Sequence, residues 1–206
     1  MNAVQLSIFA NRLAGVCDEM GAVLRLSALS PNIKDRLDFS CAIFDARGRL
    51  CAQAAHIPVH LGSMAYAMAD LVSGREWQAG DLMVVNDPYL GGTHLPDVTV
   101  IAPVFQSVAL IGFAVTRAHH ANIGAHSPGS MPVSTHLEQE GIVIAPSWLK
   151  RAGQWQVPLC RHLAGLEESG ALPAESPRFA DFSAQASACE AGARRLAELA
   201  DQQPDL

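Results

Sequence analysis

The stretch that decides the fold is DVTVIAPVFQSVALIGFAVTRAHH, residues 97–120. It contains two apolar runs rich in β-branched residues, Val98–Val104 and Val108–Thr116, and both runs predict strands. The polar pair Gln106-Ser107 separates the runs and predicts a hairpin turn. Because the strands of a hairpin run antiparallel, the start of the first strand should lie beside the end of the second.

Histidine and aspartate side chains stand at the two ends that this hairpin brings together. His94 and Asp97 precede the first strand, and His119 and His120 end the second. Two imidazoles and one carboxylate suit a divalent Mn, Zn or Fe ion and leave coordination positions open for water or substrate. Such an ion acts as a Lewis acid or lowers the pKa of bound water. The hairpin therefore predicts a metal site.

Strand geometry predicts that only one of the two adjacent histidines binds the ion. Successive side chains of a strand point to opposite faces of the sheet, so only one of the pair should face the ion. We expect His94, Asp97 and His119 to be the ligands, and His120 to support the site or contact the substrate. The alternative is that these histidines only satisfy buried polar groups at the strand ends.

The remaining patterns predict helices around a sheet. The expected helices cover residues 3–29, 61–73, 159–169 and 178–200, and the expected further strands cover 40–44, 49–53, 81–85 and 141–145. We therefore expect an α+β fold, in which a mixed, mostly antiparallel sheet is flanked by helices, with long N-terminal and C-terminal helices. A length of 206 residues is enough for one large domain or two small ones, and we expect residues 1–206 to form a single domain.

Composition narrows the class of protein. Half of the 206 residues are hydrophobic, which supports a sizeable core, and the net charge of −6 without a basic patch argues against nucleic-acid binding. No secretory signal and no apolar run of about 18 residues is present, so we expect no membrane span. Five cysteines without a C-x-x-C spacing are typical of reduced thiols, which predicts a soluble cytoplasmic protein.

Five stretches, spread along most of the chain, resemble one known family. They are RLDFSCAIFD at 36–45, HIPVHLGSM at 56–64, NDPYLGGTHLPDV at 86–98, RAHH at 117–120 and PGSM at 128–131. Together they are similar to the hydantoinase B/oxoprolinase family. That family includes the B subunits of ATP-dependent hydantoinases, 5-oxoprolinases and lactamases, and related subunits of acetone and acetophenone carboxylases.

The resemblance implies a metal-dependent hydrolase that acts on the carbon–nitrogen bond of a cyclic amide such as a hydantoin, 5-oxoproline or a lactam. In the family, a partner A subunit uses ATP to phosphorylate the substrate, and the B part completes the reaction at a divalent metal. The resemblance thus implies a hydantoinase A-like partner and a hetero-oligomer. It places the metal ligands at His94, Asp97 and His119, and it gives Asp38 a catalytic role on the attacking water.

Two other functions stay open at this point. One is a subunit of a complex like the ketone carboxylases, which needs the same metal. The other is a truncated, non-catalytic metal-binding module that serves assembly, since family members are commonly several hundred residues long and this chain has 206. We favour the cyclic-amide hydrolase.

Overall fold

The computed structural model describes residues 2–55, 58–127, 129, 133–166 and 173–202. Its helices are α1 (Ala3–Ser27), α2 (Pro31–Lys34), α3 (Pro58–Val72), α4 (Val157–Ala164) and α5 (Pro177–Asp201). Its strands are β1 (Phe39–Asp45), β2 (Leu50–Ala55), β3 (Leu82–Val85), β4 (Asp97–Gln106), β5 (Ala109–His119), β6 (Ser147–Arg151) and β7 (Gln154–Trp155). The long terminal helices and the α+β class are confirmed.

One sheet holds every strand of the described ranges, in the order β2-β1-β5-β4-β3-β6-β7. Each neighbouring pair is antiparallel, so the described strands show none of the parallel pairing that a mixed sheet would have. The β4–β5 hairpin lies at its centre, with Asp97 opposite His119 at one end and Gln106 opposite Ala109 at the other. The hairpin predicted from residues 97–120 is therefore confirmed.

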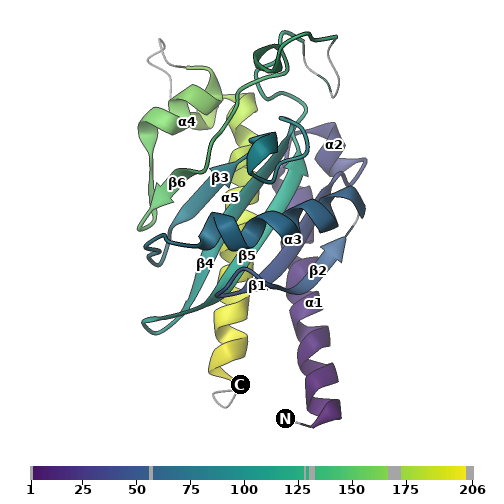
Figure 1. The fold of residues 1–206 in the computed structure, drawn as a ribbon, viewed down its shortest axis with the longest axis vertical. Helices are drawn as coiled ribbons and strands as arrows, with labels where there is room; N and C mark the ends of the chain where they lie inside the picture. Colours follow the sequence, from purple (N-terminus) through teal and green to yellow (C-terminus); the bar gives the residue numbers. More distant parts are fainter. Residues whose placement is uncertain (1, 56–57, 128, 130–132, 167–172, 203–206) are drawn as a thin grey trace.

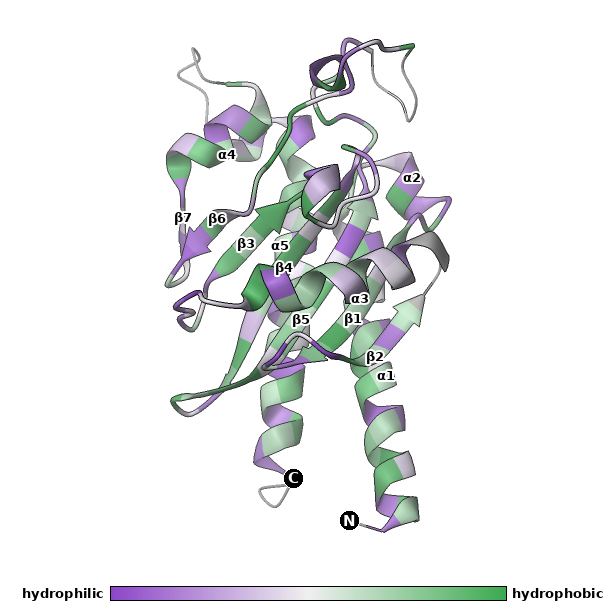
Figure 2. Ribbon diagram, in the orientation of Figure 1, coloured by the Kyte–Doolittle hydropathy of each residue, from purple (hydrophilic) through white to green (hydrophobic). Residues whose placement is uncertain are grey.

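Helices cover both faces of this sheet. The helices α1 and α5 pack side by side on one face, and α3 crosses the other face (Figure 1). Figure 2 shows that hydrophobic residues dominate the central strands between these layers. In β1, Cys41 and Ile43 join the core beneath α1 and α5, whereas Ala42 and Phe44 join the core beneath α3. This alternation decides which polar side chains face α3.

The long helix α1 begins at a capping box. The Asn2 side chain accepts from the Gln5 backbone N–H, and the Gln5 side chain accepts from the Asn2 backbone N–H. After the helix ends, the Asp181 carboxylate of α5 accepts from the backbone N–H groups of Leu29 and Ser30 at 2.8 and 3.0 Å. The segment that follows α1 is thus hydrogen-bonded to α5.

The predicted strand at 141–145 is wrong. Residues 141–145 are irregular, and the strand that pairs with β3 is β6, which begins at Ser147. The reason is a buried side chain, because the Asn86 amide donates to the Ile142 carbonyl at 2.9 Å and accepts from the Ile144 N–H at 2.7 Å. These backbone groups are satisfied by a side chain, so they form no strand ladder.

The boundaries of other elements differ slightly from prediction. The helix predicted at 159–169 is α4, which ends at Ala164 because Gly165 adopts the left-handed conformation of a helix C-cap. Residues 167–169 lie outside the described part of the chain. No helix among the described residues has the length and apolar character that a bilayer crossing requires.

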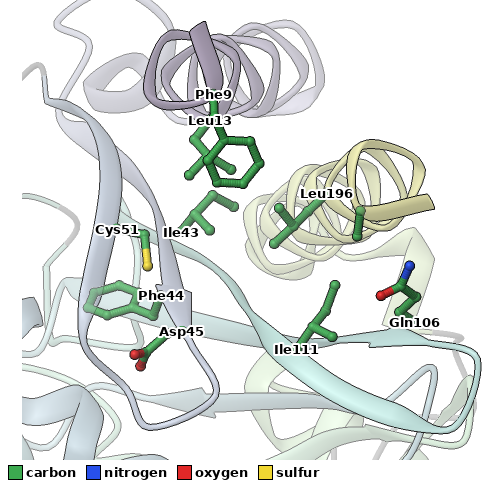
Figure 3. Close-up of a pocket in the computed structure, with 10 residues that line it drawn as sticks. Phe9, Leu13, Ile43, Phe44, Asp45, Cys51, Gln106, Ile111 and Leu196 are labelled. Carbon is green, nitrogen blue, oxygen red and sulfur yellow. The ribbon is translucent and has the colours of Figure 1, made fainter. Parts of the chain in front are cut away.

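A cavity of about 260 Å³ lies between the sheet and the free ends of α1 and α5 (Figure 3). Apolar side chains from both helices and from the sheet line it, including Phe9, Leu13, Ile111 and Leu196. Nearer the N-terminus of α1, Val4, Leu6 and Ile8 are exposed to solvent. This end of the protein therefore presents more apolar surface than isolated surface residues require.

Asn86 gives a first testable prediction. Asn86→Ala removes three buried hydrogen bonds, to the Leu95 and Ile142 carbonyls and from the Ile144 N–H. We expect the free energy of unfolding to fall by about 3 kcal/mol, because buried polar groups lose their partners. Denaturant unfolding would measure it. Asn122→Ala is the control, since exposed Asn122 accepts one bond, from Gly124 N–H; equal losses in both variants would contradict this account.

Candidate metal centre

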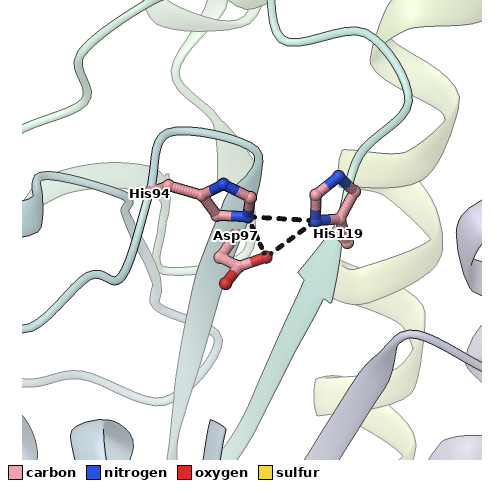
Figure 4. Close-up of side chains that lie close together, drawn as sticks. All are labelled: His94, Asp97 and His119. Carbon is pink, nitrogen blue, oxygen red and sulfur yellow. Dashed lines mark hydrogen bonds and ion pairs between the residues drawn. The ribbon is translucent and has the colours of Figure 1, made fainter. Parts of the chain in front are cut away.

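Three predicted ligands meet at one end of the central hairpin. Asp97 opens β4, His119 ends β5, and His94 lies in the loop that leads into β4. The Asp97 Oδ1 atom is 3.1 Å from His94 Nε2 and 3.0 Å from His119 Nδ1, and the two imidazole nitrogens are 3.1 Å apart (Figure 4). The three side chains thus present one ligand atom each toward a common point.

Hydrogen bonding alone does not explain this triangle. The carboxylate oxygen only accepts, so each nitrogen beside it should carry a proton. Two N–H groups would then face each other between His94 and His119. A cation removes the conflict, because both nitrogens then offer lone pairs. With ligand bonds of about 2.1 Å, neighbouring ligand atoms lie about 3.0 Å apart in an octahedron and about 3.4 Å apart in a tetrahedron. The observed spacings fit the donor set of a divalent ion.

Burial differs among the three ligands. Asp97 and His119 are almost fully buried, whereas the His94 side chain keeps 32% of its surface exposed. The site therefore opens to solvent on the His94 side. Three protein ligands would occupy only part of an ion's coordination shell, and the open side would leave room for water or a substrate atom.

Electrostatics keep the Asp97 carboxylate ionised. Burial by itself raises the pKa of Asp97, but hydrogen bonds from His119, His60, His94 and Thr93 hold that pKa well below its ordinary range. The hydrogen bond to Asp97 also raises the pKa of His94, against the opposing effect of burial. A cation would compete with a proton for the His94 nitrogen, so its binding is expected to weaken as the pH falls.

Asp38 lies at the edge of the cluster, just before β1. Its carboxylate oxygens are 3.8 Å from His119 Nδ1 and 3.8 Å from His60 Nε2, and 28% of its side chain is exposed. Its backbone carbonyl accepts from the His119 N–H at 3.0 Å. The structure therefore brings Asp38 close to the three ligands, with access to solvent.

His120 lies on the other side of the sheet, away from the three ligands. Its Nε2 atom is 2.8 Å from Gln185 Oε1 of α5, and its ring packs edge-on against Phe182. Burial lowers the pKa of His120. The predicted division between the two histidines agrees with this arrangement, but a contact between His120 and a substrate stays a prediction, which its buried position does not favour.

Two residues of the site were not recognised from the sequence alone. His60, which at the start of a helix has the sequence context of an ordinary N-terminal helix residue, points from α3 toward Asp97 and is buried. Arg117 is also buried, and it donates to Thr99 Oγ1, Ser63 Oγ and the Gly91 carbonyl. Burial lowers the pKa of Arg117 to about 10, although nearby Asp97 acts in the opposite direction.

Arg117 ties together the parts that carry the ligands. Its hydrogen bond to Gly91 holds the loop of His94, its hydrogen bond to Ser63 holds α3, and its hydrogen bond to Thr99 joins β5 to β4.

Parts of two of the five stretches that resemble the family lie outside the residues that the structure describes. These parts are residues 56–57, 128 and 130–131, so His56 and most of the stretch 128–131 are not placed.

The loop of His94 packs tightly on α3, and this gives a second prediction. Gly91 has a φ of +96°, and a Cβ there would overlap the Ala67 side chain of α3. Gly91→Ala should therefore lower the free energy of unfolding by about 3 kcal/mol, combining backbone strain with overpacking.

The control for this prediction is Gly74→Ala. Gly74 also has a positive φ, +66°, but no neighbouring atom within 4 Å of a Cβ. It should cost only about 1 kcal/mol, from the left-handed backbone alone. Thermal or denaturant unfolding of both variants measures the difference, and equal losses would show that the loop does not press on α3.

The chain is similar to known proteins in sequence and in fold. The chain is 44% identical to the 5-oxoprolinase of Saccharomyces cerevisiae over 88% of its length, which is 14% of the yeast protein. The ATP-dependent caprolactamase of Pseudomonas jessenii matches all of the chain with a TM-score of 0.84 and 28% identity, over 35% of the solved chain. An acetone carboxylase matches 97% of the chain with a TM-score of 0.80 and 20% identity, over 26% of the solved chain.

The chain corresponds to only part of the length of each of these proteins. The chain spans between 12% and 37% of the length of the curated relatives it matches. The hydantoinase B/oxoprolinase family itself matches residues 2–204. With nearly the whole sequence matched, and with relatives above 30% identity across it, the chain belongs to the hydantoinase B/oxoprolinase family.

Proposed function

We propose that this chain provides the metal-binding part of an ATP-dependent hydrolase that opens a cyclic amide such as a hydantoin, 5-oxoproline or a lactam. The convergence of His94, Asp97 and His119 carries the proposal. Membership of the family supports it, as do relatives named 5-oxoprolinase and a solved neighbour named caprolactamase. The substrate class rests on those relatives and not on a contact seen here.

The ligand set supports a divalent Mn, Zn or Fe ion held by two nitrogens and one oxygen. When bound, such an ion supplies a Lewis acid and lowers the pKa of a water molecule. His94, Asp97 and His119 would hold it, and the exposed edge of His94 leaves an approach for substrate. Buried Asp97 remains ionised and offsets part of the positive charge.

Asp38 is the residue we propose as the general base. It is a carboxylate close to the ligands, and its partial exposure lets it reach a water molecule that the buried ligands cannot. An amide carbonyl resists water because resonance protects it, and phosphorylation of its oxygen removes that protection. Asp38 would take a proton from the attacking water as the new carbon–oxygen bond forms, and would return it to the ring nitrogen as the carbon–nitrogen bond breaks. A second water would then hydrolyse the resulting acyl phosphate and release inorganic phosphate.

ATP would be used by a partner, a hydantoinase A-like subunit, and the assembly would be a hetero-oligomer. The relatives extend well beyond the matched region, and the exposed apolar residues near the start of α1 offer surface for association. We further propose that residues 1–206 act as one domain, in which the sheet joins the elements of the site, and that the protein works in the cytoplasm.

Metal content is the measurement that tests the site itself. We expect about one divalent ion per purified chain, because the three ligand atoms already converge without rearrangement. His94→Ala and His119→Ala should lose it, since each removes a ligand. His136→Ala is the control, because His136 is an exposed histidine outside the cluster and should keep the ion. An apo parent after supplementation with Mn, Zn and Fe would refute the site.

Activity of a reconstituted complex tests the reaction. Combined with an A-type subunit and ATP, the parent should open a cyclic amide, and Asp38→Asn should slow it by about 10²–10⁴-fold because the general base is lost. Ring opening is followed by chromatography, with and without bicarbonate. Turnover only of a ketone with bicarbonate would favour the carboxylase-like subunit, and full activity of His94→Ala would favour a non-catalytic module.

A further inference from the structure

One imidazole nitrogen stands between the two carboxylates of the site. His60 of α3 is 1% exposed, and its Nε2 atom is 3.5 Å from Asp97 Oδ2 and 3.8 Å from Asp38 Oδ1. His60 is not among the three converging ligands, because its Nε2 faces the opposite oxygen of Asp97. Its place must therefore be explained by what it does to the carboxylates.

The contacts of His60 define its tautomer. Both oxygens near Nε2 belong to carboxylates, which only accept hydrogen bonds, so Nε2 carries the proton. The other ring nitrogen, Nδ1, lies 3.3 Å from the buried Ser40 hydroxyl of β1. In the neutral ring this hydroxyl donates to Nδ1, and that bond fixes the orientation of the ring. Ser40, His60 and Asp97 thus form a line from β1 through α3 to β4.

The two oxygens of Asp97 have different neighbours. Oδ1 faces His94 and His119, whereas Oδ2 accepts from the Thr93 hydroxyl and faces His60. The terminal torsion of an aspartate is broad, so a carboxylate held on one oxygen only can rotate. Donors on Oδ2 restrict that rotation and leave Oδ1 directed at the cation position. Such supporting contacts orient metal ligands in proteins generally.

We propose that His60, held by Ser40, is a positioning residue that turns Asp97 so that Oδ1 alone faces the metal ion. This inference rests on the proposed metal site. It assigns a role to a histidine that is not one of the three converging ligands. It also explains why a polar ring occupies a buried position of α3, beside Met64 and Met68, where an apolar side chain would pack without needing partners.

The test compares two substitutions with Co²⁺ as the probe. His60→Gln can place an amide N–H near the position of Nε2, whereas His60→Asn is shorter and leaves Asp97 Oδ2 without that donor. Titration of each purified protein with Co²⁺, followed by its visible absorption, gives both the affinity and the coordination spectrum. We expect His60→Asn to bind about 10–100-fold more weakly with an altered spectrum. His60→Gln should stay within about threefold of the parent and keep the parental spectrum.

The outcomes separate this inference from the metal site itself. Parental affinity and spectrum in His60→Asn would overturn the positioning role while leaving the metal site intact. Equal weakening in His60→Asn and His60→Gln would also overturn it, because a donor at Nε2 would then not matter. A parent that binds no Co²⁺ would overturn both proposals. Should His60→Asn fail to fold, Ser40→Ala replaces it, with weaker binding expected and unchanged binding contradicting the proposal.

Discussion

The pairing of Asp97 with His119 in the β4–β5 ladder is the constraint on which the site depends. A carboxylate and an imidazole directly opposite each other in an antiparallel pair have side chains on the same face. Because strand side chains alternate with a period of two, a slip of one residue would move His119 to the face of α1 and α5. The apolar residues of the hairpin prevent this slip, since Val115 and Phe113 must also stay beneath α3.

This register also places the charges of the site in a low-dielectric layer. On the α3 face of the sheet, Arg117 lies two residues before His119 on β5 and opposite Thr99 of β4. Its guanidinium has no carboxylate within ion-pair distance among the described residues, and neutral oxygens satisfy it instead. A buried cation this close to the site favours the ionised form of Asp97. The hydrogen bonds of Arg117 also hold the His94 loop. Both the ionisation of Asp97 and the position of this loop therefore depend on Arg117.

The sequence predicted those parts of the site that are close along the chain or joined by a short turn. His94 and Asp97 are three residues apart, and a short turn brings the end of β5 beside the start of β4, so local patterns were sufficient to bring the ligands close together. The exact pairing of Asp97 with His119 depends in addition on a bulge after Val104, which shifts the register by one residue and which the sequence does not indicate. The contact of Asn86 with Ile144 spans 58 residues, and no local pattern indicates it. An apolar run at 141–145 therefore resembled a strand although a distant amide satisfies its backbone.

The role of His60 was hidden for the same reason, because it depends on how α3 crosses the sheet. Nothing in the sequence near residue 60 shows that β1 pairs with β5, yet this pairing places Ser40 beside Arg117 and beneath α3. Once the sheet order is known, three elements that are separate in sequence approach one carboxylate. The three proposed ligands come from one hairpin and its preceding loop, whereas two of the groups that orient them, His60 and Ser40, come from α3 and β1. A substitution in β1 or α3 would therefore change the orientation of the proposed ligands without replacing any of them.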